Sequence, residues 1–184
     1  AGTGYNYGLE LTIEKSFAKN YYILLSGSVF DSKARGNDGV YRNTDYNTRY
    51  AANMLTGYEL KLGKNSTLLT GLKMTFAGGR LYSPPDVAAS NAIGDLVVID
   101  SLRNTLQFKD YFRADIKLGV RINAKKLTHE VAIDLVNILG TRNVLSQTYN
   151  HDLAAQGAYP FITQYQLGFL PLFYYRVDFG IKHK

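Results

Sequence analysis

The chain has 184 residues, of which 46% are hydrophobic, 13% aromatic and 20% charged, and it contains neither cysteine nor tryptophan. This composition excludes an intrinsically disordered chain, a disulfide scaffold, thiolate metal sites and cysteine nucleophiles. The formal net charge of +6 would suit a polyanionic partner, but the basic residues are scattered along the sequence.

No stretch approaches the roughly 18 consecutive apolar residues that a transmembrane helix needs, which excludes a helical membrane protein. The same test does not detect transmembrane β-strands. The chain starts with AGTGYNYGLEL, without an initiating methionine or the pattern of a signal peptide, and we expect it to begin inside a longer protein.

Seven segments alternate between hydrophobic and polar residues with a period of two, which is typical of β-strands that bury one face. In chain order the predicted strands are 5–14, 21–30, 48–62, 67–82, 111–122, 128–139 and 173–181. Within the fourth, Gly78 and Gly79 predict a bulge or bend. The sequence thus predicts an all-β fold, an antiparallel meander of about seven long strands.

In six of these strands the charged residues all fall on the phase opposite the hydrophobic ones, so one face is kept free of charge. The predicted polar face carries Glu10, Glu14, Arg49, Glu59, Lys61, Lys73, Arg113, Asp115, Lys117, Arg121, Glu130, Asp134, Arg176 and Asp178. The opposite face carries Leu9, Leu11, Met54, Phe76, Ile116, Leu118, Ile133 and Val177.

The connections between the strands alternate in length. Short turns at 17–20, 63–65 and 123–127 alternate with long loops at 31–47, 83–108 and 140–163. In an antiparallel meander this places all tight turns at one end and all long loops at the other, as in outer-membrane barrels with periplasmic turns and extracellular loops.

Two other classes of protein fit part of this pattern. A small or soluble β-barrel that binds an apolar ligand also alternates, with its hydrophobic face inside. The long strands and the tyrosines near their ends favour the membrane instead, because strands of globular proteins usually have about five or six residues. A surface adhesion module is a weaker alternative.

Several runs resemble a known family: the DSK…RNT…YN loop, AGGRLYSP, DYFRAD and the terminal YRVDF. They resemble the C-terminal barrel strands of TonB-dependent outer-membrane transporters, particularly those with an N-terminal carboxypeptidase-like domain before the plug. The resemblance implies that residues 1–184 are the C-terminal portion of a 22-stranded transmembrane β-barrel. It also implies uptake of a small nutrient across the bacterial outer membrane, no cofactor, and as partners the remaining strands and plug, outer-membrane lipid and TonB.

Strand parity agrees with a fragment, because seven strands leave the two ends of the chain on opposite sides, whereas a complete barrel usually has an even number. Residues 96–100 (LVVID) would give an eighth strand and a small closed barrel. Five residues, however, are too few to span a bilayer.

No catalytic motif stands out, and we expect a non-enzyme without a metal site or a nucleic-acid partner. The three histidines, His129, His151 and His183, match no metal-ligand spacing. The loop 31–47 concentrates charged and aromatic side chains suited to a polar or sugar-like ligand, and we predict as substrate-facing residues Arg35, Tyr41, Arg42, Asp45 and Tyr46, with Asp38 nearby. The alternative is that they only order the loop around a turn at Asn37, Asp38 and Gly39.

Overall fold

The computed structural model describes residues 2–179, and its fold is all-β. Seven long strands form the main sheet: β1 (Thr3–Ala18), β2 (Tyr21–Arg35), β4 (Tyr50–Lys61), β5 (Ser66–Ala77), β8 (Tyr111–Asn123), β9 (Leu127–Val136) and β12 (Leu170–Phe179). The remaining elements are short: β3 (Tyr41–Asn43), β6 (Leu81–Tyr82), α1 (Val87–Ile93), the 3₁₀ turn η1 (Asp100–Leu102), β7 (Leu106–Gln107), β10 (Val144–Tyr149), α2 (His151–Ala155) and β11 (Phe161–Tyr165).

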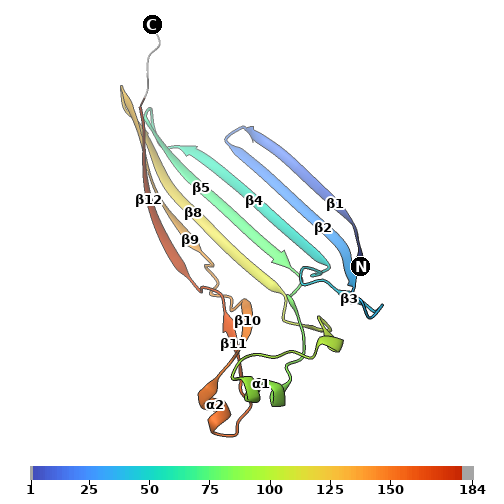
Figure 1. Ribbon diagram of the computed structural model, residues 1–184. Coiled ribbons are helices and arrows are strands. Elements are labelled where there is room, and N and C mark those ends of the chain that lie inside the picture. The colour runs from blue at the N-terminus through green and yellow to red at the C-terminus, as the bar shows by residue number, and fades with distance from the viewer. Residues whose placement is uncertain (1, 180–184) are drawn as a thin grey trace.

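The long strands pair in sequence order, β1-β2-β4-β5-β8-β9-β12, and every pair is antiparallel (Figure 1). This confirms the predicted meander. β3 adds a short strand beside the end of β2. Within residues 2–179 the sheet does not close on itself, because β1 pairs only with β2 and β12 only with β9.

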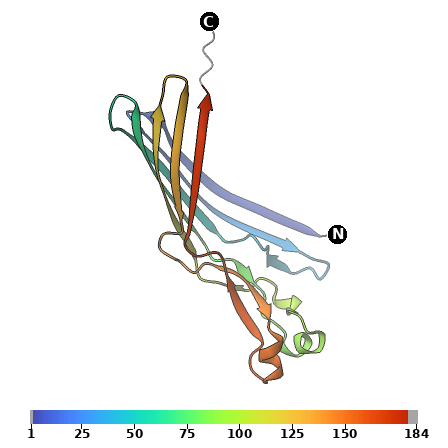
Figure 2. The same ribbon diagram turned by 90° about the vertical axis from the view of Figure 1, so that its left-hand side faces the viewer.

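The two ends of the sheet differ in structure. The tight turns after β1, β4 and β8 lie at one end, whereas α1, α2 and the β10-β11 and β6-β7 ribbons lie at the other (Figures 1 and 2). The sorting of short and long connections expected from the sequence is therefore present.

The strand register places the charged residues on one face. Partners across neighbouring strands point to the same side of a sheet. Directly opposite one another lie Lys73 and Asp115, Lys117 and Asp134, Arg121 and Glu130, and Glu130 and Arg176. The alternate positions pair hydrophobic residues such as Leu9 with Val29, Met54 with Met74 and Leu118 with Ile133.

Arg49 is an exception to the predicted polar face. It precedes β4 and has a φ of 71°, outside the extended conformation of a strand. Its backbone carbonyl accepts a hydrogen bond from Phe30 N–H, so the chain enters β4 through an irregular step. Strict alternation therefore cannot assign Arg49 to a face.

Several strand boundaries differ from those expected. β2 continues five residues beyond Phe30, to Arg35, and β5 ends at Ala77, so Gly78 and Gly79 lie after the strand. β9 ends at Val136 instead of residue 139, and β12 begins at Leu170. The predicted continuation of the last strand to residue 181, and His183, lie outside the described residues.

The possible eighth strand at 96–100 does not form. Val98 makes only an isolated bridge to Pro85, and Asp100 begins the 3₁₀ turn. Val97 N–H instead bonds to the hydroxyl of Ser90 in α1, which ties this segment to the helix. The alternative in which residues 96–100 supply an eighth strand is therefore wrong.

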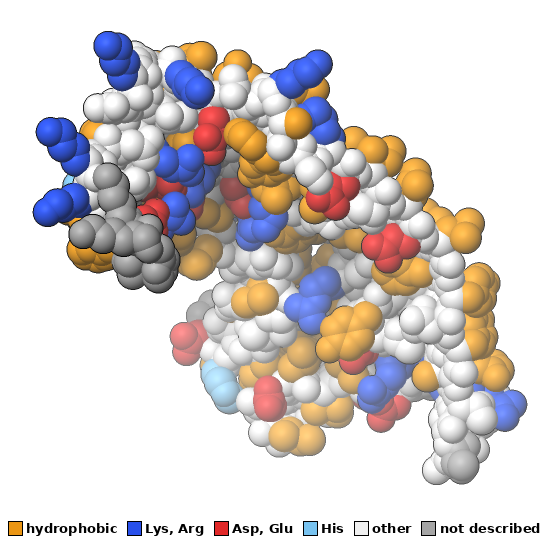
Figure 3. All heavy atoms as spheres, turned by 90° about the horizontal axis from the view of Figure 1, so that it is seen from above, with side chains coloured by type: hydrophobic (Ala, Val, Ile, Leu, Met, Phe, Trp, Pro, Cys, Tyr) orange, Lys and Arg blue, Asp and Glu red, His pale blue; other side chains and the backbone are white. Residues whose placement is uncertain are grey.

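The main sheet forms a single curved layer with an exposed hydrophobic face. Leu9 and Phe173 are each 79% exposed, and few hydrophobic side chains anywhere in residues 2–179 are fully buried. Figure 3 shows charged side chains gathered inside the curve and hydrophobic ones along its outer side. We call these sides the concave and convex faces. No helix in residues 2–179 is long and apolar enough to span a membrane.

Candidate functional site: a groove between two loops

Two long loops are joined by a pair of asparagines at the end of the sheet that carries the helices. Asn43, at the end of β3, donates through its side-chain amide to the carbonyl of Asn104 over 3.0 Å. Asn104 donates in return to the carbonyl of Asn43 and to a carboxylate oxygen of Asp45, each over 2.8 Å. Asn104 is buried, so this reciprocal contact fixes loop 31–47 against loop 83–108.

A second asparagine fixes the base of the first loop. Asn47 is completely buried; its side-chain oxygen accepts from Ser32 N–H over 3.0 Å. Its amide nitrogen donates to Asp31 over 2.8 Å and to the side chain of Asn43 over 3.0 Å. The loop is therefore held by buried polar contacts, which would be costly to leave unsatisfied.

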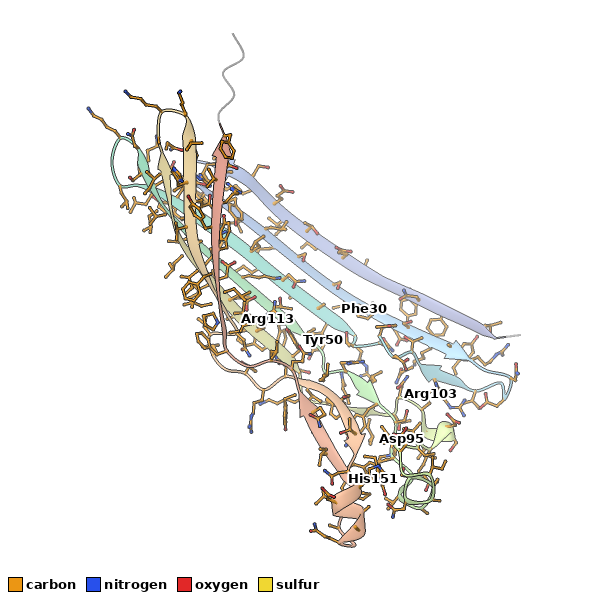
Figure 4. All side chains as sticks on the ribbon, turned by 60° about the vertical axis from the view of Figure 1, so that its left-hand side comes forward. Phe30, Tyr50, Asp95, Arg103, Arg113 and His151 are labelled. Carbon is orange, nitrogen blue, oxygen red and sulfur yellow. The ribbon has the colours of Figure 1, made fainter. Side chains whose placement is uncertain are left out.

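The two loops enclose an open groove of about 790 Å³. Its wall from the first loop is formed by Ala34, Gly36, Asn37, Asp38, Arg42, Asn43, Thr44, Asp45 and Tyr46, and its wall from the second by Asp100, Ser101, Arg103 and Asn104. Figure 4 labels Arg103, which lies below the loop end of β2. Sequence reasoning missed this second wall, because no motif marks residues 100–104 and only the fold brings them beside residue 42.

Three of the five predicted substrate-facing residues line the groove: Arg42, Asp45 and Tyr46. Tyr46 is 83% exposed, so its ring is free to stack on a ligand. The guanidinium of Arg42 is already engaged, because it pairs with Asp38 over 2.6 Å and donates to the carbonyl of Ser101 over 3.2 Å. Arg42 therefore helps to hold the two walls together.

Arg35 and Tyr41 do not line the groove. In the short ladder of β2 and β3, Arg35 lies opposite Tyr41 and Ala34 lies opposite Arg42. Because neighbouring residues of a strand point to opposite faces, Tyr41 and Arg42 are separated. Arg35 stacks over the ring of Tyr41, with 5.4 Å between its guanidinium carbon and the ring centre.

Two groups in the groove have shifted pKa values. The pKa of Asp38 is lowered by a hydrogen bond from Val40 N–H and by the guanidinium of Arg42. The pKa of Arg103 is raised by its hydrogen bond to Asp100. The groove therefore offers carboxylates, guanidinium groups, amides and an aromatic ring to a polar ligand.

A cluster of charges lies on the concave face near the turn end. Glu130 is only 3% exposed and is surrounded by Arg121 and Arg176, 3.1 and 3.2 Å away, with Lys117 at 3.8 Å. The hydroxyl of Tyr174 also donates to Glu130, and Arg121 reaches across to Glu59. The cluster ties four strands together through their side chains.

Two further buried asparagines order the third long loop: Asn143 attaches it to the sheet and Asn137 bonds within the loop. Asn143 accepts from the N–H of Phe112 and donates to its carbonyl, over 3.0 and 2.9 Å. Asn137 bonds to both the N–H and the carbonyl of Thr141. Two hydrogen bonds connect this loop to the segment between β5 and β8. Arg80 donates to the carbonyl of Leu145, and the hydroxyl of Tyr149 donates to the side-chain oxygen of Asn91. Figure 4 labels His151, at the start of α2 beside this contact.

Comparisons with protein-family models, with curated proteins and with solved structures each find no match to this chain. Within residues 2–179, no three His, Asp or Glu side chains gather as a metal ion would require. What the groove offers is hydrogen bonding and stacking for a polar molecule that approaches from the loop end.

Proposed function

We propose that this chain is the C-terminal barrel segment of a TonB-dependent outer-membrane transporter for a small nutrient. The observation that carries the proposal is the convex face, which is hydrophobic, exposed and bordered at both ends by tyrosines. Tyr5, Tyr7 and Tyr50 border it at the loop end, and Tyr21, Tyr58 and Tyr175 at the turn end. Two aromatic girdles around an apolar band are typical of outer-membrane barrels.

The height of the band supports the proposal. On β1, the convex positions between Tyr5 and Lys15 are Tyr7, Leu9, Leu11 and Ile13, with no charge among them. Ten residues at about 3.4 Å each, in a strand tilted by about 45°, rise by about 24 Å. This agrees with the hydrophobic band of about 25 Å in such barrels.

In this proposal the remaining strands of the same protein pair with the free edges of β1 and β12 and close the wall around a plug. The concave face becomes the lumen, and the groove between the first two long loops faces the outside, where substrate arrives. A soluble barrel for an apolar ligand would need the hydrophobic face inside the curve.

Lipid exposure tests this placement directly, because residues 1–184 contain no cysteine, so an introduced cysteine is unique in this segment once any cysteine elsewhere in the full-length protein has been replaced. In full-length protein reconstituted into lipid vesicles, fluorophores attached at Leu11→Cys, Leu118→Cys and Phe173→Cys should be quenched by lipid-borne nitroxides. Matched labels one residue away, at Thr12, Lys117 and Tyr174, should not be quenched. Equal quenching of both sets, or failure of the protein to sediment with outer membranes, would overturn the placement.

The transporter class needs its own measurement. Full-length protein in detergent should be retained on an immobilised periplasmic domain of TonB, and a variant lacking the segment before the plug should not. If the labels show normal lipid exposure but the protein is not retained on the TonB domain, the membrane placement would be supported and the TonB-dependent function would be refuted.

A further inference from the structure

One part of the convex face departs from the hydrophobic pattern. At the loop end of β2, Lys33 lies opposite Tyr5 and Arg35 opposite Thr3, on the same face as Tyr7 and Leu9. These basic residues therefore point outward beside the aromatic border, away from the groove and from the concave face.

Arg35 has no partner for its charge among the described residues. Its guanidinium forms no ion pair within residues 2–179 and stacks over Tyr41. Tyr41 in turn packs against Tyr5, with 5.5 Å between ring centres, and Tyr5 stacks on Tyr7 at 5.7 Å. A guanidinium that lies over an aromatic ring without an ion-pair partner keeps its N–H donors available to a ligand.

Lys33 is only partly neutralised. Its ammonium group lies 3.7 Å from a carboxylate oxygen of Asp31, a loose pair. Asp31 already accepts a 2.8 Å hydrogen bond from the buried Asn47 and a longer one from the hydroxyl of Tyr5. These neutral donors leave the charge of Asp31 in place, so Asp31, Lys33 and Arg35 together leave one net positive charge beside the tyrosines.

The turn end of the same hairpin shows the contrast. Lys15 also points to the convex face beside a tyrosine, with its ammonium group 3.6 Å from the ring centre of Tyr21. All its donors are used, however, because it bonds to the carbonyls of Ser16, Ala18 and Tyr21. The two ends of the hairpin thus differ: the ammonium group of Lys15 is hydrogen-bonded to the chain itself, whereas the guanidinium of Arg35 has donors available to a ligand.

We propose that Arg35, with Lys33 and the ring of Tyr41, binds the phosphate group of an outer-leaflet lipid. The inference rests on the proposed membrane placement, which puts the loop end of the convex face at the headgroup layer. A planar guanidinium matches two phosphate oxygens at once, and Tyr5 and Tyr7 would lie against the upper acyl chains. The ligand class is a phosphorylated acylated lipid.

Native mass spectrometry of the full-length protein in detergent, titrated with diphosphorylated lipid A, tests the site. Arg35→Gln with Lys33→Gln should weaken binding about tenfold or more, as expected for loss of charge-assisted hydrogen bonds. The affinity of Arg35→Lys should lie between those of the unmodified protein and the double variant, because lysine keeps the positive charge but cannot donate two parallel hydrogen bonds to a phosphate. The matched control, Lys61→Gln with Lys73→Gln on the concave face, removes the same charge and should bind like the unmodified protein.

Two further arms separate the source of the phosphate from general charge effects. Dephosphorylated lipid A should bind equally weakly to all variants, and millimolar inorganic phosphate should not displace the lipid. Unchanged binding in the Arg35 and Lys33 variants, an equal loss in the control, or displacement by inorganic phosphate would each overturn the site. Normal lipid quenching of a fluorophore at Leu118→Cys, measured with the same variants reconstituted into lipid vesicles, distinguishes that failure from failure of the membrane placement.

Discussion

Buried asparagines carry much of the order in the long loops. Asn47, Asn104, Asn137 and Asn143 are all buried, and each bonds to backbone groups. Asn47, Asn104 and Asn143 reach another segment, whereas Asn137 bonds to Thr141 in its own loop. An amide has both a donor and an acceptor, so one side chain can satisfy an N–H and a carbonyl together. Such residues give a loop a fixed shape without a hydrophobic core beneath it.

Asn47→Ala should therefore loosen the first loop. The substitution removes the acceptor of Ser32 N–H and one donor each from Asp31 and Asn43, and an unsatisfied buried group costs about 1–3 kcal/mol. Hydrogen exchange should accelerate in residues 31–47. Asn65→Ala, in an exposed turn at the other end of the sheet, is the control and should leave that exchange unchanged.

The tip of the same loop should respond to acid. The pKa of Asp38 is lowered in the folded protein, so its contacts stabilise the loop tip at pH values above 3.8, the ordinary pKa of an aspartate. This stabilisation is lost as the pH falls through and below 3.8. The amide resonance of Val40, which donates to Asp38, should shift over this range. An Asp38→Asn variant should show no such shift; persistence of the shift would assign it to another group.

At the scale of single strands, the two faces tolerate different substitutions. If Ile116 lies near the bilayer midplane, Ile116→Arg should cost about 2–4 kcal/mol, because the guanidinium would face hydrocarbon. Urea unfolding of the protein in lipid vesicles measures the loss. Lys117→Gln, one residue away on the concave face, should lower the free energy of unfolding much less. A larger loss for Lys117→Gln than for Ile116→Arg would mean that the concave face, and not the convex face, contacts lipid.

After β5 the backbone at Gly79 packs closely against the backbone of Phe108. A Cβ on Gly79 would overlap the carbonyl of Phe108, which belongs to backbone and cannot move aside easily. Gly79→Ala should destabilise the protein by about 1–3 kcal/mol, the usual cost of overpacking. Gly63→Ala has open space around it and is the matched control in the same denaturation experiment.

The sequence predicted the strands well and their ends poorly. Alternation places Leu118 and Lys117 on opposite faces directly, because strand geometry fixes a period of two. It could not show that β2 continues to Arg35, since charges enter the outward face there and the segment looks like a loop. The groove depends on Asn43 and Asn104, sixty-one residues apart, and no local pattern predicts that pairing.

At the scale of the whole molecule, the open sheet makes a geometric prediction. Leu9 and Val29 are direct partners, so cysteines at these positions should form a disulfide on oxidation of the full-length protein. Cysteines at Leu9 and Phe173 lie on strands at opposite edges and should not. A Leu9–Phe173 crosslink within one molecule would indicate a small closed barrel.

The bond between Asn143 and Phe112 has a consequence for how such a protein can diversify. β9 pairs with β8 from Ile116 to Asn123, which leaves the loop end of β8 without a neighbouring strand on that side. There Asn143 bonds to the backbone of Phe112, and the N–H of Ile138 donates to the carbonyl of Ala114. The wall is thus completed before the rest of the loop begins. Insertions or deletions after Asn143 can then alter the exposed part of the loop without breaking the ladder, so one wall can carry many different loop surfaces over evolutionary time.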